Sequence, residues 1–207
     1  MSEHSPEHTN ATTRKKNPIR SKTGRVFIIS APSGAGKTTL CNALLKKSPD
    51  LLYSISHTTR KPRTGELDGV DYFFITADEF KHNIKKETWA EWAQVHDHFY
   101  GTSAQFIDRH LSEGKDILLD IDVNGARQIL DRYPHSVTIF IMPPTFETLA
   151  QRLRSRGTDS DEIITKRLKN AKTEIAQKDF YTHIVINDSL PEAIEMLSAI
   201  ISDNQIR

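Results

Sequence analysis

The stretch Arg25-Val-Phe-Ile-Ile-Ser-Ala-Pro-Ser-Gly-Ala-Gly-Lys-Thr-Thr39 decides the fold class of this chain. Residues 25–30 form a short apolar run with β-branched residues, a pattern typical of a buried strand. Pro32, Gly34 and Gly36 then mark a loop, and a helical pattern follows over residues 38–47. The stretch therefore predicts a strand, a glycine-containing loop and a helix in direct succession.

Three further apolar runs predict strands later in the chain, at residues 116–122, 136–142 and 183–187. The first two are continuous rather than alternating, which is typical of strands buried on both faces of a sheet. Helical patterns fill the intervals, over residues 103–113, 124–132, 146–156, 161–177 and 191–202. Because strands and helices alternate, we expect an α/β fold with a parallel sheet covered by helices.

Residues 54–102 interrupt this alternation. Short aromatic or β-branched pieces at residues 53–56 and 72–75 are separated there by loops rich in Arg, Pro and Gly. We expect this segment to be a lobe inserted into a core made of residues 25–53 and 103–207. The composition of Gly157-Thr-Asp-Ser160 suits a mobile segment, so we also expect a small helical lid over about residues 150–170.

Composition narrows the class of protein. At 207 residues, with 37% hydrophobic and 27% charged residues, the chain resembles one compact soluble unit with small insertions. A formal net charge of +1 provides no basic field for general nucleic-acid binding, and no apolar stretch is long enough to span a membrane. Cys41 is the sole cysteine, so we expect a buried structural thiol in a reducing, cytoplasmic protein.

The first 24 residues differ from the rest. They hold five Lys/Arg and two Glu, which leaves 23 Lys/Arg (28 minus 5) and 25 Asp/Glu (27 minus 2) for the remainder. The segment is polar, contains Pro6 and Pro18 and has no apolar run like that of a signal peptide, so we expect residues 1–24 to be a disordered tail. A transit peptide is the alternative, and Glu3 and Glu7 count against it.

The loop at residues 31–38 matches the phosphate-binding motif G-x-x-x-x-G-K-[ST], with Ala31 in place of the first Gly. Alanine is tolerable there if it keeps a negative φ. Gly34 and Gly36 let backbone N–H groups turn toward phosphate oxygens, and the N-terminus of the following helix adds a partial positive charge. A glycine-rich turn with an incidental lysine is the alternative, and the flanking strand and helix count against it.

Each polar residue of the loop has an expected role. Lys37 can reach the β- and γ-phosphates, Thr38 supplies a hydroxyl to ligate Mg²⁺, and Thr39 is better placed to cap or pack. The expected nucleotide-binding residues are Ala31, Pro32, Ser33, Gly34, Ala35, Gly36, Lys37, Thr38 and Thr39. The loop predicts a bound nucleotide but does not identify a reaction.

A second anion site is predicted in the inserted segment. Arg60 and Arg63 lie three residues apart in a loop stiffened by Pro62, and two guanidinium groups at this spacing can bind one phosphate dianion. A solvated Arg/Lys loop is the alternative for this segment taken alone. Neutral hydroxyl donors are available from Ser56, Tyr72 and Tyr100.

The segment Ser54-Ile-Ser-His-Thr-Thr-Arg-Lys-Pro-Arg-Thr-Gly-Glu66, followed by Gly69-Val-Asp-Tyr72, resembles the GMP-binding segment of guanylate kinases. The family's order continues in Tyr100-Gly-Thr102, Asp120-Ile-Asp122 and Arg152-Leu-Arg-Ser-Arg-Gly157, and the likeness covers about residues 25–205. The resemblance implies a P-loop NTPase core, an inserted GMP-binding lobe and a small lid. It also implies transfer of the γ-phosphate of Mg-ATP to GMP and, we expect, to dGMP.

The same resemblance assigns Glu91, Thr102 and Asp122 to the guanine base. Guanine presents its N1–H and its exocyclic amine as donors, so a carboxylate is a suitable acceptor. Many relatives have Ser at the position of Thr102, and the hydroxyl is kept here. An exposed or capping role is the alternative for each carboxylate taken singly. The phosphate contacts of GMP are then Ser56, Arg60, Arg63, Tyr72 and Tyr100.

Three arginines of the expected lid are the remaining candidates for contact with the transferring phosphate. By resemblance, Arg152, Arg156 and Arg167 close over ATP, where they would add positive charge at the transferring phosphate and exclude water. Solvated arginines on helices are the alternative for each one singly. The expected catalytic residues are Lys37, Arg60, Arg152, Arg156 and Arg167.

Two residues at strand ends are assigned by their place in the chain. Asp120 stands at the end of the apolar run Ile117-Leu-Leu and is expected to orient Mg²⁺ through water. A cap at the strand terminus is its alternative role. Asn187 ends the last predicted strand and matches the adenine-side loop of the family.

Other functions compete with this assignment. A regulatory GTPase is suggested by Asp122-Val-Asn-Gly125, which matches D-x-x-G, but no Asn-Lys-x-Asp segment occurs. Guanylate-kinase-like binding modules typically lack a working phosphate loop, whereas this chain keeps Lys37 and Thr38. A kinase for AMP or for pyrimidine nucleotides would have no reason to pair the arginine loop with Glu91. The oligomeric state is left open.

Overall fold

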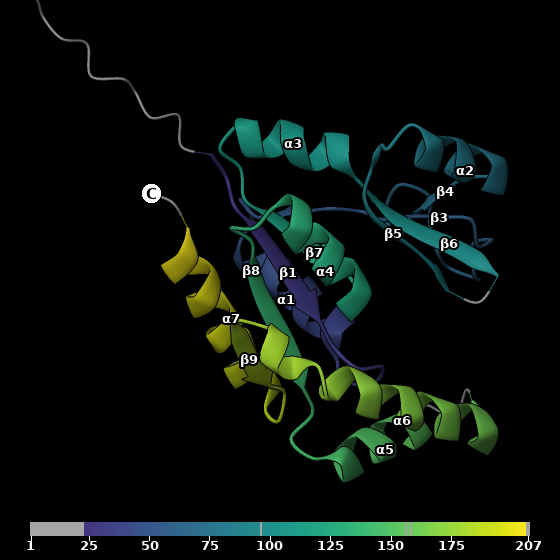
Figure 1. Cartoon of the computed structure of the whole chain (residues 1–207). Coiled ribbons are helices and arrows are strands. Elements are labelled where there is room, and N and C mark those ends of the chain that lie inside the picture. The colour runs from purple at the N-terminus through teal and green to yellow at the C-terminus, as the bar shows by residue number, and fades with distance from the viewer. Residues whose placement is uncertain (1–22, 96, 156, 158, 206–207) are drawn as a thin grey trace, which may run out of the picture.

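The computed structural model describes residues 23–95, 97–155, 157 and 159–205 (Figure 1). The predicted tail lies outside this range, apart from Thr23 and Gly24. A five-stranded sheet with strand order β2-β7-β1-β8-β9 forms the core, and every neighbouring pair in it is parallel. Its strands are β1 (Val26–Ser30), β2 (Leu52–Tyr53), β7 (Ile117–Asp120), β8 (Val137–Met142) and β9 (His183–Ile186). The predicted α/β fold is confirmed.

Helices cover both faces of this sheet (Figure 1). One face carries α1 (Lys37–Lys47) and α7 (Leu190–Asn204), and the other carries α3 (Ala104–Ser112) and α4 (Val123–Arg132). Leu44 on the first face and Ile107 on the second are fully buried, as expected for strands with apolar residues on both sides. Cys41 lies in the first of these layers, and burial raises the pKa of its thiol to about 12, in agreement with a structural role.

Strand register brings the predicted functional segments to one edge of the sheet. Where β1 pairs with β7, Ile29 lies opposite Asp120. The loop that follows Ser30 therefore begins beside the end of β7. Because the carboxyl ends of parallel strands meet at one edge, Asp120 and Asp122 lie next to the phosphate loop.

Two helices stand outside these layers (Figure 1). They are α5 (Phe146–Ser155) and α6 (Asp161–Ile175), which bury Leu149, Leu153, Ile164 and Ala171 between them. A Cβ placed on Gly34 would lie 2.9 Å from the side chain of Leu153. The helix α5 therefore packs directly on the phosphate loop. No helix in the described part of the chain is long and apolar enough to cross a membrane.

A second sheet, with strand order β4-β3-β6-β5, lies in the interrupting segment. Its strands are β3 (His57–Thr58), β4 (Phe73–Phe74), β5 (Trp89–Val95) and β6 (His98–Ser103), and α2 (Ala77–Lys85) packs on it. Phe80 of α2 stacks on Trp89, with ring centroids 4.5 Å apart. The sequence analysis did not predict α2 or the β5–β6 hairpin. A signal existed for α2, because Thr76 caps it by accepting the N–H of Glu79.

Candidate functional site

The phosphate loop has the geometry that its motif requires. Gly34 and Gly36 adopt φ of 94° and 95°, and α1 begins directly after them at Lys37. These left-handed conformations favour glycine and turn the backbone toward the helix N-terminus. Among the described residues, Glu87 is the only one other than glycine with a positive φ, so Ala31 keeps a negative φ. Alanine at the first motif position therefore costs the loop nothing in backbone strain.

A cavity of about 340 Å³ opens in front of this loop. Its lining contains eight of the nine loop residues expected to bind the nucleotide. The ninth, Ala35, is fully buried beneath the loop. Asp122 and Glu174 complete the lining from the neighbouring loop and from α6. The cavity residues are Ala31, Pro32, Ser33, Gly34, Gly36, Lys37, Thr38, Thr39, Asp122 and Glu174.

Asn187 lies beside the phosphate loop and also forms a hydrogen bond to its backbone. Its side-chain amide donates to the carbonyl of Ala35 over 2.7 Å, and a Cβ on Gly36 would approach that amide nitrogen to 2.4 Å. A further cavity of about 330 Å³ lies on this side of the loop and includes Asn187 and Arg152. The residue expected at the adenine side therefore also holds the loop in its conformation.

Lys37 pairs with Asp120 across the edge of the sheet. The ammonium group of Lys37 contacts the Asp120 carboxylate, and both side chains are largely buried. Burial opposes the charge on Lys37, but the attraction of Asp120 and the hydrogen bond to it outweigh burial, so the pKa of Lys37 is raised. The lysine therefore carries its positive charge at neutral pH.

A larger cavity of about 510 Å³ lies between the core and the second sheet. From the core it includes Lys37, Thr38, Asp120 and Asp122, and the second sheet and its loops contribute further residues that are predicted to bind GMP. The residues predicted to bind GMP that line the cavity are Asp122 from the core and Ser56, Tyr72, Glu91 and Tyr100 from the other side. This cavity shares Ser33, Lys37, Thr38 and Asp122 with the cavity in front of the phosphate loop. The two spaces therefore adjoin at the loop.

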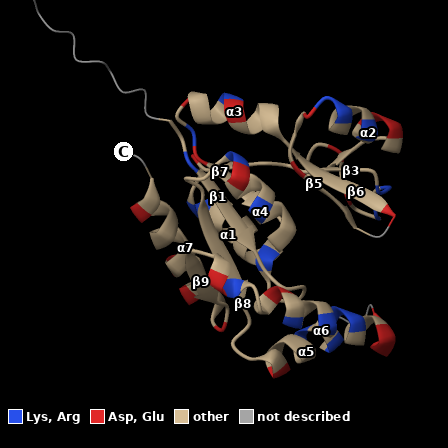
Figure 2. Ribbon diagram, viewed as in Figure 1, with Lys and Arg blue, Asp and Glu red and all other residues tan. Residues whose placement is uncertain are grey.

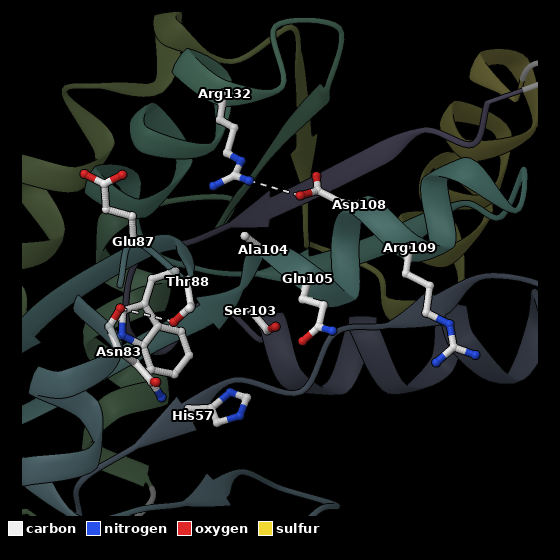
Figure 3. Close-up of a pocket in the computed structure, with 11 residues that line it drawn as sticks. His57, Asn83, Glu87, Thr88, Ser103, Ala104, Gln105, Asp108, Arg109 and Arg132 are labelled. Atoms are coloured by element: carbon white, nitrogen blue, oxygen red, sulfur yellow. Dashed lines mark hydrogen bonds and ion pairs between the residues drawn. The ribbon is translucent and has the colours of Figure 1, made fainter. Parts of the chain in front are cut away.

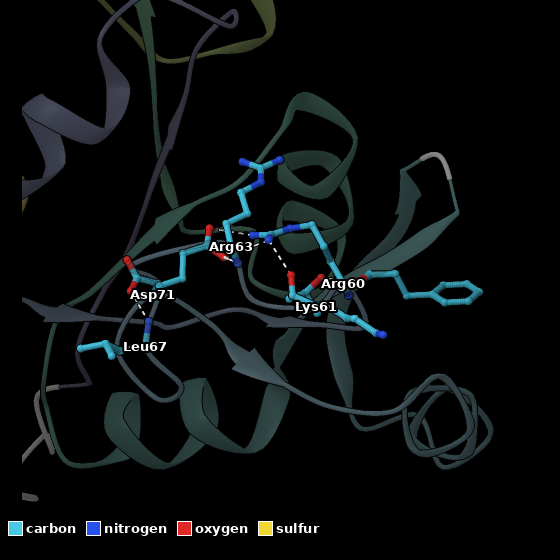
Figure 4. Close-up of polar contacts among 8 residues, drawn as sticks. Arg60, Lys61, Arg63, Leu67 and Asp71 are labelled. Atoms are coloured by element: carbon cyan, nitrogen blue, oxygen red, sulfur yellow. Dashed lines mark hydrogen bonds and ion pairs between the residues drawn. The ribbon is translucent and has the colours of Figure 1, made fainter. Parts of the chain in front are cut away.

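Arg60 stands at the margin of this cavity, held by Glu66 (Figure 4). Two nitrogens of its guanidinium group donate to the two oxygens of Glu66 over 2.9 and 2.8 Å, and one of them also donates to the carbonyl of Lys61. The guanidinium carbon lies 5.4 Å from the centre of the Tyr72 ring. Hydrogen bonding to Glu66 raises the pKa of Arg60, so its charge is permanent.

Arg63 is less engaged than Arg60. Its side chain is exposed, and its backbone N–H donates to the Glu66 carboxylate over 2.7 Å. Neither arginine belongs to the lining of the larger cavity, although Tyr72, beneath Arg60, does. The role of Glu66 in organising both arginines was missed by the sequence analysis. A carboxylate three residues after Arg63 in a turn was the available signal.

Glu91 is a buried carboxylate with one hydrogen-bond partner in the described part of the chain. It is 6% exposed, and the hydroxyl of Thr102 donates to it over 2.6 Å. Burial raises the pKa of Glu91 to about 7, the negative charge of Asp122 adds to this, and the Thr102 hydrogen bond opposes it. A Cβ on Gly125 would lie 2.8 Å from the carboxylate, so only glycine leaves room for it there.

Asp122 begins α4 and faces both cavities. Its carboxylate accepts the backbone N–H of Gly125 over 2.8 Å, which caps the first turn of the helix. The D-x-x-G pattern of residues 122–125 is thus explained as a helix cap with glycine beside Glu91. One carboxylate oxygen is used in the cap.

The three predicted lid arginines stand in different situations. Arg152 donates to the backbone carbonyl of Asn187 over 3.0 Å, and its other terminal nitrogen is buried without a hydrogen bond within the described part of the chain. Arg167 pairs with Asp159 at 2.9 Å. Arg156 lies outside the described residues. The structure therefore places Arg152 beside the phosphate loop and pairs Arg167 with Asp159.

Another cavity, of about 640 Å³, lies where the second sheet meets α3 (Figure 3). It includes His57, Gln105 and the ion pair of Arg132 with Asp108, whose atoms are 3.0 Å apart. None of the residues predicted for substrate binding lines it. Volume alone therefore does not identify the site in this molecule.

Comparison with known proteins agrees with the geometry. The sequence profile of the family described as guanylate kinase matches residues 23–204. The chain belongs to the guanylate kinase family. The guanylate kinase of Caldanaerobacter subterraneus subsp. tengcongensis is 47% identical over 186 residues, which is 90% of each chain. That of Geobacter sulfurreducens is 47% identical over 184 residues, 89% of this chain and 91% of the relative.

A solved structure of a family member supports the same conclusion. The guanylate kinase of Anaplasma phagocytophilum superimposes with a TM-score of 0.75 at 30% identity, covering 90% of this chain and 89% of that one. The family's fold, with a parallel sheet flanked by helices, is thus the fold found here. Within that fold, Tyr53, Asp71 and Glu174 also line the site cavities, and Glu66 orients Arg60, although the sequence predicted no role for any of them.

Proposed function

We propose that this chain transfers the γ-phosphoryl group of ATP to GMP, and also to dGMP, releasing ADP and the nucleoside diphosphate. The observation that carries the proposal is the junction of the two cavities. A donor nucleotide on the phosphate loop and an acceptor beside Glu91 would meet at Lys37 and Thr38, which line both spaces. Phosphoryl transfer chiefly requires such alignment together with stabilisation of the spreading negative charge.

Guanine selectivity is assigned to Glu91, Thr102 and Asp122. An ionised Glu91 can accept hydrogen bonds from the N1–H and the exocyclic amine of guanine. Thr102 holds one oxygen of that carboxylate in place over 2.6 Å. Adenine lacks an N1–H, so its ring nitrogen would face the carboxylate without a proton between them. The pocket thereby disfavours AMP by repulsion as well as favouring GMP by attraction.

The acceptor phosphate is assigned to Arg60, Arg63, Ser56, Tyr72 and Tyr100. Tyr72 and Tyr100 line the larger cavity, with ring centres 6.0 Å apart. Arg60 is already oriented by the planar contact with Glu66, so less side-chain entropy is lost when a phosphate arrives. We propose that residues 54–102 act as the lobe that delivers this phosphate to the loop.

Lys37 and Asp120 separate when the donor binds. In the nucleotide-free protein each neutralises the other. ATP would draw the ammonium group to its β- and γ-phosphates and leave the Asp120 carboxylate for water or metal. Lys37 is therefore charged both before and after ATP binds: Asp120 raises its pKa in the nucleotide-free protein, and the phosphates would favour its charge in the complex.

Mg²⁺ is the expected companion of ATP. The hydroxyl of Thr38 and the carboxylate of Asp120 both line the larger cavity, and oxygen ligands of this kind suit Mg²⁺. Thr38 would hold the ion directly and Asp120 would hold it through water. When bound, the ion would neutralise part of the phosphate charge. Among the described residues, no group of three or more His, Cys, Asp or Glu could hold a metal ion.

The lid arginines would act on closure. Arg152 has a buried nitrogen available for a phosphate oxygen. Arg167 would exchange Asp159 for phosphate on closure. Closure would also exclude water, which otherwise hydrolyses ATP. Arg156 completes the proposed catalytic set.

We also propose that the protein acts in the cytoplasm, because its buried free thiol at Cys41 suits a reducing compartment.

The decisive experiment measures ADP formation from Mg-ATP with GMP, dGMP, AMP, CMP and UMP supplied separately. Turnover restricted to the guanine nucleotides is expected. Turnover with another base would retain a kinase and overturn the assignment of Glu91. Silence with all five would favour a guanylate-kinase-like binding module, because such a module can bind nucleotide without transferring phosphate.

A further inference from the structure

The strand that carries Glu91 lies at the edge of its sheet. In the order β4-β3-β6-β5, β5 stands last and pairs with β6. The register of this pair shifts between Trp89 and Glu91, so β5 accommodates one extra residue, Ala90, directly before the carboxylate. A bulge of this kind interrupts the ladder and re-aims the side chains beside it. The position of Glu91 therefore depends on support from outside the sheet.

Gln128 of α4 provides such support at the residue after Glu91. The backbone N–H of Trp92 donates to the side-chain oxygen of Gln128 over 3.1 Å. In return, the side-chain nitrogen of Gln128 donates to the backbone carbonyl of Trp92 over 3.0 Å. The side-chain amide thus pairs with both backbone groups of Trp92, as a neighbouring strand would.

The face of α4 that carries Gln128 also borders Glu91. Gly125 precedes Gln128 by three residues, which places the two on one side of the helix. A Cβ on Gly125 would lie 2.8 Å from the Glu91 carboxylate. Asp122 caps the start of the same helix and lines the cavity that contains Glu91. The contact at Trp92 therefore fixes β5 to the helix that carries the second carboxylate of the base pocket.

The residue type suits this contact. Charged residues also occur on α4, where Figure 2 shows both signs, and they include Arg127, Asp131 and Arg132. An arginine offers only donors and an ionised carboxylate only acceptors, whereas a glutamine offers both. One backbone N–H and one backbone carbonyl require both, so an amide at position 128 satisfies Trp92 where a charged side chain would not.

We propose that Gln128 is a positioning residue for guanine recognition, which fixes β5 to α4 so that Glu91 and Asp122 face the base together. The inference rests on the proposed transfer of phosphate to GMP and deepens it. Gln128 lines neither the cavity in front of the phosphate loop nor the larger cavity, so it acts through Glu91 and not on the nucleotide. Its loss should therefore affect recognition of the acceptor base and leave ATP binding nearly unchanged.

The test compares two substitutions of Gln128. Gln128→Met keeps the length of the side chain but makes neither hydrogen bond, and Gln128→Glu keeps only the acceptor. Loss of two hydrogen bonds predicts a rise in the KM for GMP of about five- to tenfold in Gln128→Met. The KM in Gln128→Glu should rise at least as far, because its carboxylate faces the carbonyl of Trp92. The KM for ATP and kcat should stay within about twofold of the unmodified enzyme.

Gln105→Met is the matched control. It makes the same exchange at an exposed glutamine of α3 and should change none of these values. The comparison with IMP, which lacks the exocyclic amine of guanine, makes the readout specific to the base. The ratio of kcat/KM for GMP to that for IMP should fall by about three- to fivefold in Gln128→Met and stay constant in Gln105→Met.

Two further readouts do not depend on turnover. Exchange of the Trp92 amide hydrogen, followed by NMR, should be faster in Gln128→Met than in the unmodified protein and in Gln105→Met. The calorimetric affinity for GMP relative to IMP should fall in Gln128→Met as the kinetic ratio does. This affinity ratio tests the inference even in a protein that does not phosphorylate GMP.

Several results would overturn the inference. Equal exchange of the Trp92 amide in all variants would mean that Gln128 does not hold β5. Faster exchange with an unchanged preference for GMP over IMP would mean that the contact stabilises the strand without positioning Glu91. Equal rises in the KM for GMP and the KM for ATP would indicate general destabilisation. Gln128→Glu keeps the comparison valid if Gln128→Met fails to fold.

Failure of the proposed function gives a different pattern. An unmodified protein that binds GMP without phosphorylating it would contradict the proposed transfer alone, and the affinity ratio would still decide the role of Gln128. An unmodified protein that does not bind GMP would overturn both proposals.

Discussion

The phosphate loop and the pocket around Glu91 bind their ligands by different means. The loop is a single stretch of backbone whose glycines adopt φ of 94° and 95°, and its donors are N–H groups that cannot change charge. The pocket is built from side chains on β5, β6 and α4, and its central carboxylate titrates near neutrality, with a pKa of about 7. The loop should therefore be indifferent to pH, whereas the pocket should depend on it.

Removal of Lys37 should give the largest difference between the two regions, because it should lower kcat far more than the affinity of the pocket for GMP. Lys37→Ala removes the cation that lines both cavities and leaves Asp120 without its partner. A charge that stabilises the transition state is worth about 100- to 1,000-fold in kcat. Steady-state kinetics should show this loss, while calorimetric affinity for GMP changes by less than about tenfold. Equal losses in kcat and in GMP affinity would contradict a role centred on the transferring phosphate.

Removal of Arg60 tests the acceptor side alone. Arg60→Ala deletes the guanidinium and leaves the Glu66 carboxylate without its ion-pair partner near the expected phosphate. The kcat/KM for GMP should fall by about 30- to 100-fold, the scale of one or two charged hydrogen bonds. The KM for ATP should move little.

Arg109→Ala is the matched control for Arg60→Ala. Arg109 also pairs with a glutamate, Glu113, but lies on α3 with an exposed side chain. Its loss should leave both substrates unaffected, because surface pairs of this kind contribute little. A similar loss in both variants would indicate general destabilisation rather than phosphate binding.

Glu91→Gln should weaken GMP binding and stabilise the fold. The amide still accepts from Thr102 but offers guanine one acceptor in place of two, so the KM for GMP should rise about 10- to 30-fold and discrimination against AMP should fall. The shift of the Glu91 pKa from 4.5 to about 7 corresponds to about 3 kcal/mol of destabilisation above pH 7.

The pH dependence of that stability follows from proton binding. Between pH 4.5 and about 7 the folded protein keeps the Glu91 proton that the unfolded chain has lost, so stability falls as pH rises. Thermal melts should therefore show a larger gain for Glu91→Gln at pH 8 than at pH 5.5. Glu162→Gln, at an exposed glutamate in the first turn of α6, is the control for a general charge effect. A gain that does not depend on pH would exclude titration of Glu91 as the cause.

The contrast between the regions also explains what could be predicted from sequence. The phosphate loop is a local motif, so residues 31–39 and the strand and helix around them were predicted closely. Four of the five strands of the larger sheet followed from its apolar runs, whereas β2 (Leu52–Tyr53) was not predicted as part of it. The pocket is assembled from residues 56 to 122, and only resemblance to a family joined Glu91 with Thr102 and Asp122.

The features that could not be predicted from the sequence all depend on contacts between residues far apart in the chain. The β5–β6 hairpin has no two-residue Gly turn and alternates poorly, so periodicity did not reveal it. Glu174 lines the cavity in front of the phosphate loop because α6 folds beside that loop, which no local sequence pattern records. Likewise, the burial that raises the pKa of Glu91 depends on α4, where Gly125 leaves the space for its carboxylate.

Thr102→Val should have the smallest effect on the KM for GMP, and it tests how far GMP binding depends on the ionisation of Glu91. It removes the hydroxyl that donates to Glu91 over 2.6 Å while keeping the shape of the side chain. Because that hydrogen bond lowers the pKa of Glu91, its loss raises the pKa further, and less of the carboxylate is ionised at pH 7. The KM for GMP should rise about three- to tenfold at pH 7. The rise should shrink at pH 9, where Glu91 is ionised in both proteins.

The ratio of KM values between Thr102→Val and the unmodified enzyme removes the main interference. The phosphate of GMP itself titrates near pH 6, but it does so equally with both proteins and cancels in the ratio. Thr102→Ser keeps the donor and should give a ratio near one at every pH. If Thr102→Val instead raised KM equally at pH 7 and pH 9, the hydroxyl would contact the base directly, and the tuning of Glu91 would not be its role.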